Sequence, residues 1–492
     1  MDDRKSPIFK RGENFFLLAL SGWFYPETDW LSAWLKRIAI PIFYLIGLYQ
    51  WADFLNWGKI PTDLADWADI TFPRLVLLQD ALMRGILPLN IQLATGMKGA
   101  TDRYLAIPDI FLSPQGILLR YLQSGPFILL NTLLMFSLSF YGLLLLRRKF
   151  KFSLAAFMIL FVLFNFNGHI VDHLSIGHFS WEGYFLLPFF ALLTFNLLEG
   201  DTSWRWVAKF SVLMLIIFLQ GSFHLFVWCL LFISVLSLFK GNIRKAGLLG
   251  CLSALLLCAL RIAPAGLVAT DLKIGFSSGF TSLGDLLKGL VELVVPAHAL
   301  DANTLLNPQV NWWEFDHYIG WVGLTFIVVF GLYFWFKKST CPHRYLELVL
   351  PIGLLTLISI GRIYKVVFLL NIPLLSGERV TSRFLILPLV FLIFLGTAHF
   401  QVWLNEHKPW PAVQSLFLAL SLILFSDLTQ HMELWKVVHL NTLFAPTPPD
   451  LAQWVVNNHA DPVYTLTLVI GLGVSVLTSG CLIVLSKSTK KL

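Results

Sequence analysis

Charged residues are scarce in this chain: Asp, Glu, Lys and Arg make up only 13% of the 492 residues, whereas hydrophobic residues make up 57%. A soluble globular surface needs more charge than this, so the composition argues against a soluble fold and predicts a membrane protein. Cysteine is also rare, with five residues in apolar or basic segments, so no disulfide framework is expected. Internal repeats, low-complexity segments and Asn-x-Ser/Thr sequences do not occur.

Long apolar runs, by contrast, recur along most of the chain. Hydrocarbon about 30 Å thick needs roughly 20 apolar residues for each helical span. Strands of about ten residues with alternating polarity are absent, which predicts an all-α, polytopic transmembrane helical bundle and not a barrel. Single spans are predicted at 38–56, 126–146, 152–171, 179–198, 246–264, 318–336, 345–362, 384–402, 411–431 and 463–485.

The apolar segment 210–239 is too long for one span and too short for two. Both of its flanks are basic, with Arg205 before it and Lys240 after it, which places both flanks in the cytoplasm. We therefore expect two shortened helices that meet at Gly221 beneath a cavity. The total becomes about 12 spans with both termini cytoplasmic, and the chain is expected to be a multi-pass plasma (inner) membrane protein. The net charge of +7 mostly reflects this topological bias, so nucleic acid is not an expected partner.

The predicted organisation has four parts. They are a cytoplasmic or interfacial N-terminal segment at 1–36, an N-terminal transmembrane module at 37–264 with a large first outer loop at 57–125, an outer loop at 265–317, and a C-terminal transmembrane module at 318–492. Long loops between helices usually bind or catalyse.

Carboxylates open the first outer loop. Asp63, Asp66 and Asp69 recur at every third position, so in a helix they would lie close to one face. The following segment, 71–87, has the pattern of an amphipathic helix, and we expect it to lie along the membrane surface. Such aspartates either cap a helix in a solvated loop or take part in chemistry.

This loop resembles the first external loop of C-type glycosyltransferases (GT-C), and more narrowly that of bacterial YfhO-type membrane proteins. The resemblance rests on an acidic residue after the first span, an interfacial helix and the exit "GILPL". It implies a membrane enzyme that moves a sugar from a polyprenyl-phosphate-linked donor to an acceptor at the outer face. It also implies an essential carboxylate, which Asp69 matches best and Asp66 second.

The sequence departs from that family pattern at one position. Many relatives have a second carboxylate directly after the essential one, whereas here Asp69 is followed by Ile70. A strict two-carboxylate metal site is therefore not expected, and a divalent cation such as Mg²⁺ or Mn²⁺ stays open as a cofactor. The chemistry needs a general base near the acceptor hydroxyl, and negative charge near the oxocarbenium-like transition state, and one carboxylate supplies both.

Histidines gather where one apolar run ends and the next begins. In "NGHIVDHLSIGHFSW" His169 and His173 stand four residues apart, Asp172 precedes the second, and His178 follows. Three interpretations stay open: a Zn²⁺ or Mn²⁺ site, contact with the phosphate of a lipid-linked donor, or satisfaction of a buried turn. His224, after the break at Gly221, is expected either to face the same cavity or to be a core histidine.

Arginines open a late span. Arg379 and Arg383 stand four residues apart at its outward end, and arginine binds phosphate bidentately. The pattern again resembles YfhO-type proteins. Alternatively, Glu378 pairs with one arginine and the other reaches to lipid headgroups. Glu314 lies among aromatic residues in the preceding outer loop, a composition found both in sugar sites and in interfacial belts.

Two other functions share these features. A transporter or flippase of lipid-linked saccharides would have the same spans and cationic site, but transporters usually place polar residues near the bilayer midplane in repeated halves. Here the polar residues gather at outward ends and no repeat is present. The third reading is a non-catalytic membrane scaffold.

Overall fold

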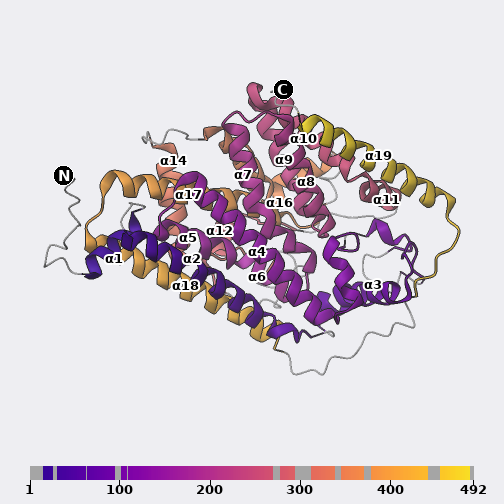
Figure 1. Cartoon of the computed structure of the whole chain (residues 1–492), viewed down its shortest axis with the longest axis horizontal. Coiled ribbons are helices and arrows are strands. Elements are labelled where there is room, and N and C mark those ends of the chain that lie inside the picture. Colours follow the sequence, from indigo (N-terminus) through magenta and orange to yellow (C-terminus); the bar gives the residue numbers. More distant parts are fainter. Residues whose placement is uncertain are drawn as a thin grey trace, which may run out of the picture.

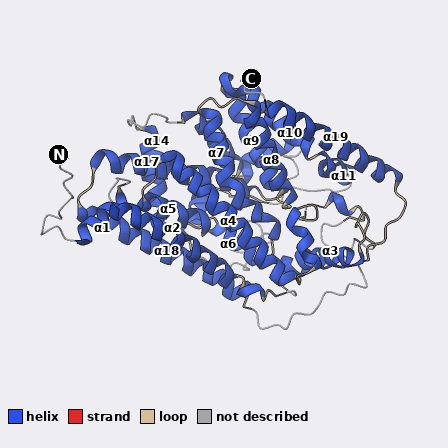
Figure 2. Ribbon diagram, in the orientation of Figure 1, coloured by secondary structure: helices blue, strands red, loops and turns tan. Residues whose placement is uncertain are grey.

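The computed structural model describes residues 15–25, 30–61, 64–92, 94, 101–107, 109–269, 278–293, 312–337, 345–370, 378–441, 455–487 and 492. Within these ranges the regular structure is helical, and β-pairing is limited to isolated bridges (Figure 2). The all-α class predicted from the sequence is confirmed.

The helices differ widely in length. Those of the N-terminal half are α1 (Phe15–Phe24), α2 (Trp30–Phe54), α3 (Phe72–Arg84), α4 (Ser124–Phe150), α5 (Leu154–Asn165), α6 (Gly168–Ser175), α7 (Leu187–Leu198), α8 (Trp204–Leu219) and α9 (Phe223–Phe239). Those of the C-terminal half are α10 (Gly241–Leu257), α11 (Ala259–Ala269), α12 (Leu283–Val291), α13 (Gly320–Phe326), α14 (Phe334–Phe336), α15 (Val349–Ile358), α16 (Gly361–Leu369), α17 (Ile386–His407), α18 (Pro411–His439) and α19 (Pro462–Ser486). Short 3₁₀ or π turns are η1 (Asn56–Gly58), η2 (Trp67–Thr71), η4 (Tyr104–Ala106), η5 (Pro114–Arg120), η6 (Phe179–Leu186), η8 (Trp312–Glu314), η9 (Ile327–Tyr333), η10 (Leu346–Leu348) and η11 (Thr381–Leu385).

Among the described residues, six helical segments are long and apolar enough to cross a membrane, and a seventh is added if the bent pair α10 and α11 forms one span. The six are Ser124–Phe150, Leu154–Ser175, Phe179–Leu198, Thr381–His407, Pro411–His439 and Pro462–Ser486. Each overlaps a span predicted from the sequence, which is consistent with a multi-pass membrane protein. The predicted spans at 318–336 and 345–362 correspond to shorter apolar helices, so the total of about 12 stays a prediction.

The long helices pack side by side around a mostly apolar core. α18 runs beside α1 and α2 at one end of the molecule, and α19 packs against α8, α10 and α11 at the other (Figure 1). α5 and α17 pack against each other between these ends, and both are largely buried. α19 instead leaves large apolar side chains exposed, such as Leu477 at 72% and Val484 at 68%. Lipid contact would cover such a surface.

The amphipathic helix predicted at 71–87 is α3. Its apolar face, including Phe72 and Leu78, is buried, and Gly85 ends the helix at a φ of 67°. Asp80 and Arg84 form an ion pair on the exposed side. The helix is therefore confirmed, and its position at the membrane surface stays a prediction.

The segment predicted as one span at 246–264 is bent by 72° between α10 and α11. Pro264 lies inside α11 and cannot donate to Leu260 O, so its effect falls within α11 and not at the bend, which lies between Leu257 and Ala259. A contact with α19 stabilises the bend, because Leu260 N donates to Ser475 Oγ at 3.1 Å. Gly471 of α19 lies so close that a Cβ there would meet Ala259 O at 2.8 Å.

A polar side chain and a glycine mark the breaks between α5 and α6 and between α8 and α9. The Asn167 amide donates to the carbonyls of Leu163 and Phe164, and so caps the last turn of α5 before α6 begins. The break predicted at Gly221 is present, since α8 ends at Leu219, α9 begins at Phe223 and Gly221 has a φ of 87°.

Glu182 anchors η6 in the interior. Its buried carboxylate accepts hydrogen bonds from Asn131, Thr132 and Gln220, which belong to α4 and to the end of α8. Buried carboxylates need such donors. The contacts fix the segment that carries Trp181 against two long helices.

The first outer loop docks on the turn between α6 and η6. Trp67 Nε1 donates to Ser175 O at 2.9 Å, and Thr71 Oγ1 donates to Gly177 O at 2.5 Å. Gly177 has a φ of 100°, and a Cβ on it would lie 2.4 Å from Trp67 N. Only glycine allows both this turn and this close approach.

Replacing Gly177 by alanine should destabilise the fold by more than about 1 kcal/mol, because the new methyl group meets backbone and the φ is unfavourable. Unfolding followed by tryptophan fluorescence in detergent measures the loss. Gly200→Ala is the matched control, since Gly200 has a φ of 94° but no atom within 4 Å of its would-be Cβ. Equal losses in the two variants would show that the close approach to Trp67 is unimportant.

Candidate functional site

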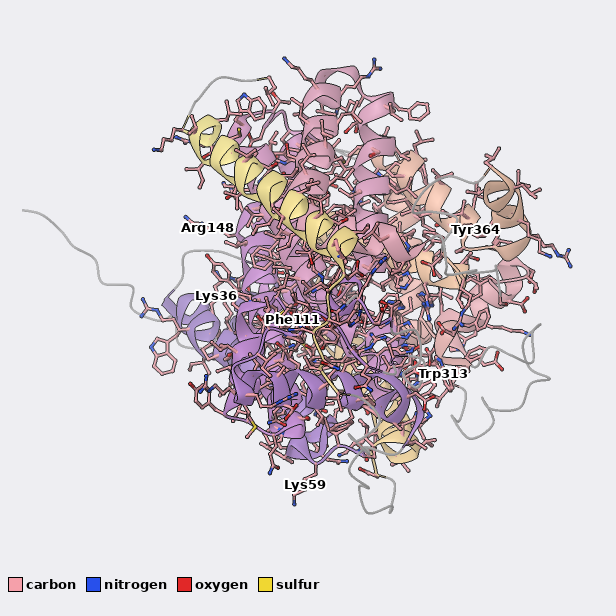
Figure 3. The ribbon with its side chains drawn as sticks, turned by 90° about the vertical axis from the view of Figure 1, so that its right-hand side faces the viewer. Lys36, Lys59, Phe111, Arg148, Trp313 and Tyr364 are labelled. Carbon is pink, nitrogen blue, oxygen red and sulfur yellow. The ribbon has the colours of Figure 1, made fainter. Side chains whose placement is uncertain are left out.

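A cavity of about 410 Å³ lies where the outer loop meets the helix ends. Its wall is formed by residues from 66–75, 109–110, 177–181, 221–224, 313–314 and 379–383. Each of these segments was predicted from the sequence to lie at an outward loop or outward helix end. The fold thus gathers into one cavity polar residues that are far apart in the chain. Figure 3 labels Trp313, which belongs to the cavity wall, and shows nitrogen and oxygen atoms gathered in the neighbouring interior.

An acid and two histidines form a hydrogen-bonded chain at one side of the cavity. His178 Nε2 lies 2.6 Å from Asp66 Oδ2, and His178 Nδ1 lies 2.8 Å from His173 Nδ1. Asp66 and His178 line the cavity, whereas His173 is fully buried behind them. The turn at Gly177 creates this geometry, because it brings His178 N back to His173 O at 2.9 Å.

Asp69 is placed differently from the expectation that Asp66 and Asp69 share one face. Ala65 has a φ of 49° and η2 is a π turn, so the helical spacing assumed for the aspartates does not hold. Trp67 is buried, Ile70 and Thr71 line the cavity, and Asp69 is exposed outside its wall. Asp63 lies outside the described residues.

The histidine cluster is divided between the cavity and the interior. His178 lines the cavity, while His169, Asp172 and His173 are buried at 1% exposure or less. The ring centroids of His169 and His173 are 4.6 Å apart, and those of His169 and His317 are 5.0 Å apart. Burial lowers the pKa of His317 to about 4, so His317 is neutral at pH 7.

Arg383 is held in the cavity wall by carboxylates. Its Nε donates to Glu314 Oε2 at 2.5 Å, its other amine pairs with Glu314 Oε1, and Glu378 lies 3.9 Å from its third nitrogen. Glu378 also accepts from His224 at 2.9 Å. Burial alone would raise the pKa of Glu378, but His224 and Arg383 outweigh it and hold that pKa below its usual value.

Arg379 differs from Arg383 in its pairing. Its side chain is exposed at the cavity, and in the described part of the chain no carboxylate forms an ion pair with it. Its backbone is fixed, because Ser278 N donates to Arg379 O at 3.2 Å and Thr381 N donates to Ser278 O at 2.8 Å. Of the expected alternative, Glu378 lies 3.9 Å from Arg383, whose direct partner is Glu314, and the reach of Arg379 to lipid headgroups stays a prediction.

The Trp181 ring contacts two histidines and the Arg383 guanidinium. It stacks on His173 at 4.4 Å and on His224 at 5.7 Å, and the Arg383 guanidinium lies 5.2 Å from its ring centroid. Phe179, Phe223 and Trp313 add further aromatic surface to the cavity. Such surface can stack on the C–H face of a sugar or on an isoprenoid chain.

The sequence did not identify several residues of the wall. Arg74 of α3 and Asp109 line the cavity, and Arg261 Nη2 lies 3.2 Å from Asp109 Oδ1. Burial lowers the pKa of Arg74, while Asp109, Tyr104 and Asp66 act in the opposite direction. An arginine within an amphipathic helix is an ordinary surface residue by pattern, so no sequence signal distinguishes Arg74.

Buried hydrogen bonds tie the segment before α13 to α18. Asp316 Oδ2 lies 2.8 Å from His431 Nε2 and accepts from Trp435 Nε1 at 2.9 Å. His431 and Trp435 stand four residues apart on α18, a spacing that can place two side chains on one partner. These contacts hold Glu314 at the cavity.

The described residues contain no group of three or more His, Cys, Asp or Glu side chains arranged to hold a metal ion. The proposed Mg²⁺, Mn²⁺ or Zn²⁺ sites therefore have no preformed ligand set within these ranges.

Comparison of the chain with protein-family models, with curated proteins and with solved structures found no match.

Proposed function

We propose that the protein is a GT-C-type membrane glycosyltransferase that moves a sugar from a polyprenyl-phosphate-linked donor to an acceptor hydroxyl at the outer face of the plasma membrane. The observation that carries the proposal is the single cavity that unites Asp66 and His178 with Arg379 and Arg383. Both termini are then cytoplasmic.

Each part of the cavity has a role in this reaction. The acceptor oxygen bonds to the anomeric carbon, the bond from that carbon to the phosphate oxygen breaks, and the acceptor proton passes to Asp66. Arg379 carries a charge that no described carboxylate neutralises, so it suits the phosphate that leaves with the lipid. Asp66 replaces Asp69 as the essential carboxylate, because Asp66 lines the cavity and Asp69 does not.

The apolar surroundings suit a lipid-borne donor. Aromatic side chains line the cavity beside the charged groups, and two parts of its wall, 179–181 and Arg383, belong to helical segments that can cross a membrane. A sugar on an isoprenoid chain would reach the cavity with its chain in the bilayer and its phosphate at the interface.

Purified protein in bilayers, given radiolabelled polyprenyl-phosphate sugars and a mixture of glycan and lipid acceptors, tests the proposal. Transfer of label to an acceptor is the expected result. Movement of intact donor across the bilayer without transfer would instead identify a flippase, and neither activity would favour a scaffold.

Arg379→Gln should raise the KM for the lipid-linked donor about tenfold or more, because a charged hydrogen bond to phosphate contributes about 1.5–3 kcal/mol. The kinetics of transfer measure the change. Arg84→Gln is the control, since Arg84 lies on α3 outside the cavity wall and pairs with Asp80. An unchanged KM for the donor in Arg379→Gln would remove the phosphate role.

A further inference from the structure

A second hollow, a groove of about 400 Å³, lies at the far end of α9 from the cavity. The first turn of α9 carries His224 in the cavity wall, and its last turn carries Phe239 in the groove wall. α9 has 17 residues, so the two sites are about 24 Å apart along this helix. The groove is therefore separate from the cavity and from the sugar transfer proposed for it.

Apolar side chains form the walls of the groove. Residues at intervals of three or four share one side of a helix, and on this side of η10 and α15 the groove is lined by Leu346, Leu350, Gly353 and Leu357. Phe239 of α9 lies in the other wall and is 74% exposed. Exposed apolar surface of this kind marks contact with a membrane or a partner.

The groove has the length of one lipid leaflet. Leu346 and Leu357 stand 11 positions apart, which corresponds to about 16 Å along a helix. Half of a hydrocarbon core of about 30 Å is about 15 Å. An acyl chain that enters at one end of the groove therefore reaches the bilayer midplane at the other.

Basic residues gather at one end of the groove. Lys240 Nζ pairs with Glu347 Oε1 at 2.6 Å, and both residues line the groove. Arg244 Nη2 donates to Leu238 O at 3.0 Å, which holds its guanidinium at the last turn of α9. Lys245 follows on α10, so these three cations outnumber the carboxylate of Glu347. The excess positive charge attracts an anionic headgroup.

Contacts behind the groove fix its charged end. Tyr345 precedes the first groove residue of η10 and is buried, and its hydroxyl donates to Glu199 Oε1 at 2.6 Å. Its ring packs against the rings of Phe150 and Phe195. The start of η10 is thus held in place by the protein itself, so the groove is formed before any ligand binds, as is usual for ligand sites.

We propose that this groove binds an anionic phospholipid, with one acyl chain along α15 and the phosphate at Lys240 and Arg244. The apolar walls fit a hydrocarbon chain, their length fits one leaflet, and the positive end fits a phosphodiester. The sequence predicts that these basic residues lie in the cytoplasm, and the cytoplasmic leaflet carries anionic lipids. The lipid would fill the space between the ends of α9 and α15.

Gly353→Leu tests the acyl-chain site, because Gly353 lines the groove and nothing lies within 4 Å of its would-be Cβ. Leucine would occupy the space of the chain, and it favours a helix more than glycine does. Native mass spectrometry of the full-length, delipidated protein with added phosphatidylglycerol measures binding. We expect the Kd to rise about tenfold, which corresponds to two methylene groups displaced from apolar contact. Gly473→Leu on α19 is the control, since its Cβ is equally free but lies outside the groove.

Arg244→Gln tests the headgroup site. Wild-type protein should bind phosphatidylglycerol more tightly than phosphatidylcholine with the same chains, by about fivefold for each basic residue at the phosphate. Arg244→Gln should reduce that preference about fivefold and leave the Kd for phosphatidylcholine unchanged. Arg205→Gln is the matched control, because Arg205 is also exposed, donates to the helix-end carbonyl of Ser486 at 3.1 Å and lies outside the groove.

Four results would overturn the proposal. Equal Kd values in Gly353→Leu and Gly473→Leu would place the lipid elsewhere, and equal affinity for the two lipids would remove the anionic headgroup. Competition by soluble glycerol phosphate as strong as that by phosphatidylglycerol would identify a phosphate site without a chain. A wild-type dimer that Gly353→Leu dissociates would show that a second copy fills the groove. Unfolding followed by tryptophan fluorescence checks that each variant is folded.

Discussion

Asp66→Asn should lower the rate of sugar transfer by at least about 100-fold, which is the lower range of what general acid–base catalysis contributes. Asparagine has nearly the size of aspartate but cannot take the acceptor proton or stabilise positive charge on the sugar. Asp66 lines the cavity and contacts His178 Nε2 at 2.6 Å, so its carboxylate is next to the expected position of the acceptor. Label transferred from a radioactive donor in bilayers measures the loss.

Asp69→Asn provides the matched comparison. The substitution is the same and lies three residues away, but Asp69 is exposed outside the cavity wall. Its transfer rate should stay within about twofold of the wild-type rate, as is usual for surface positions. If Asp69→Asn abolishes transfer and Asp66→Asn does not, the assignment based on the cavity is wrong and the assignment implied by the family resemblance is right.

The largest loss of stability should follow from Glu314→Ala. This change leaves the buried Arg383 without its bidentate partner, and removing one member of a buried ion pair costs about 3–5 kcal/mol. Glu378 at 3.9 Å is too distant to replace two direct hydrogen bonds. The free energy of unfolding, measured by tryptophan fluorescence in detergent, gives the loss.

Two further variants test whether the loss of stability in Glu314→Ala comes from leaving the buried Arg383 charge without a partner. Asp80→Ala breaks the exposed ion pair with Arg84 and should cost at most about 1 kcal/mol. The double variant Glu314→Leu with Arg383→Met removes both charges and should recover much of the stability lost in Glu314→Ala. A loss in Glu314→Ala no larger than in Asp80→Ala would show that Arg383 finds another partner or is solvated.

The helix boundaries were largely predictable because their causes are local. Apolar runs predicted the spans, and Gly221 predicted a break that the structure contains. The bend between α10 and α11 was missed, because no local sequence signal stands at Cys258, where the two helices meet. The bend is stabilised by the hydrogen bond from Leu260 N to Ser475 Oγ, and Ser475 lies far away in the sequence.

The site was only partly predictable, because the contacts that form it join residues far apart in the sequence. The sequence drew attention to His178, Glu314, Arg379 and Arg383, and these line the cavity with Asp66. It ranked Asp69 above Asp66 on the family resemblance alone, and the π turn at Trp67–Thr71, which decides the side each aspartate faces, has no signal in the sequence. It gave no reason to add Arg74 or Asp109, since nothing in their local pattern differs from ordinary loop and surface residues.

The sequence by itself determined that the chain is an apolar helical protein whose polar side chains gather at the ends of its helices. Hydrophobicity, glycine, proline and capping side chains act over a few residues, so their effects can be read along the chain. Only the tertiary structure decided which polar side chains meet. Arg383 pairs with Glu314 across 69 positions and His178 with Asp66 across 112, and such contacts arise from the packing of whole helices, which no local pattern encodes.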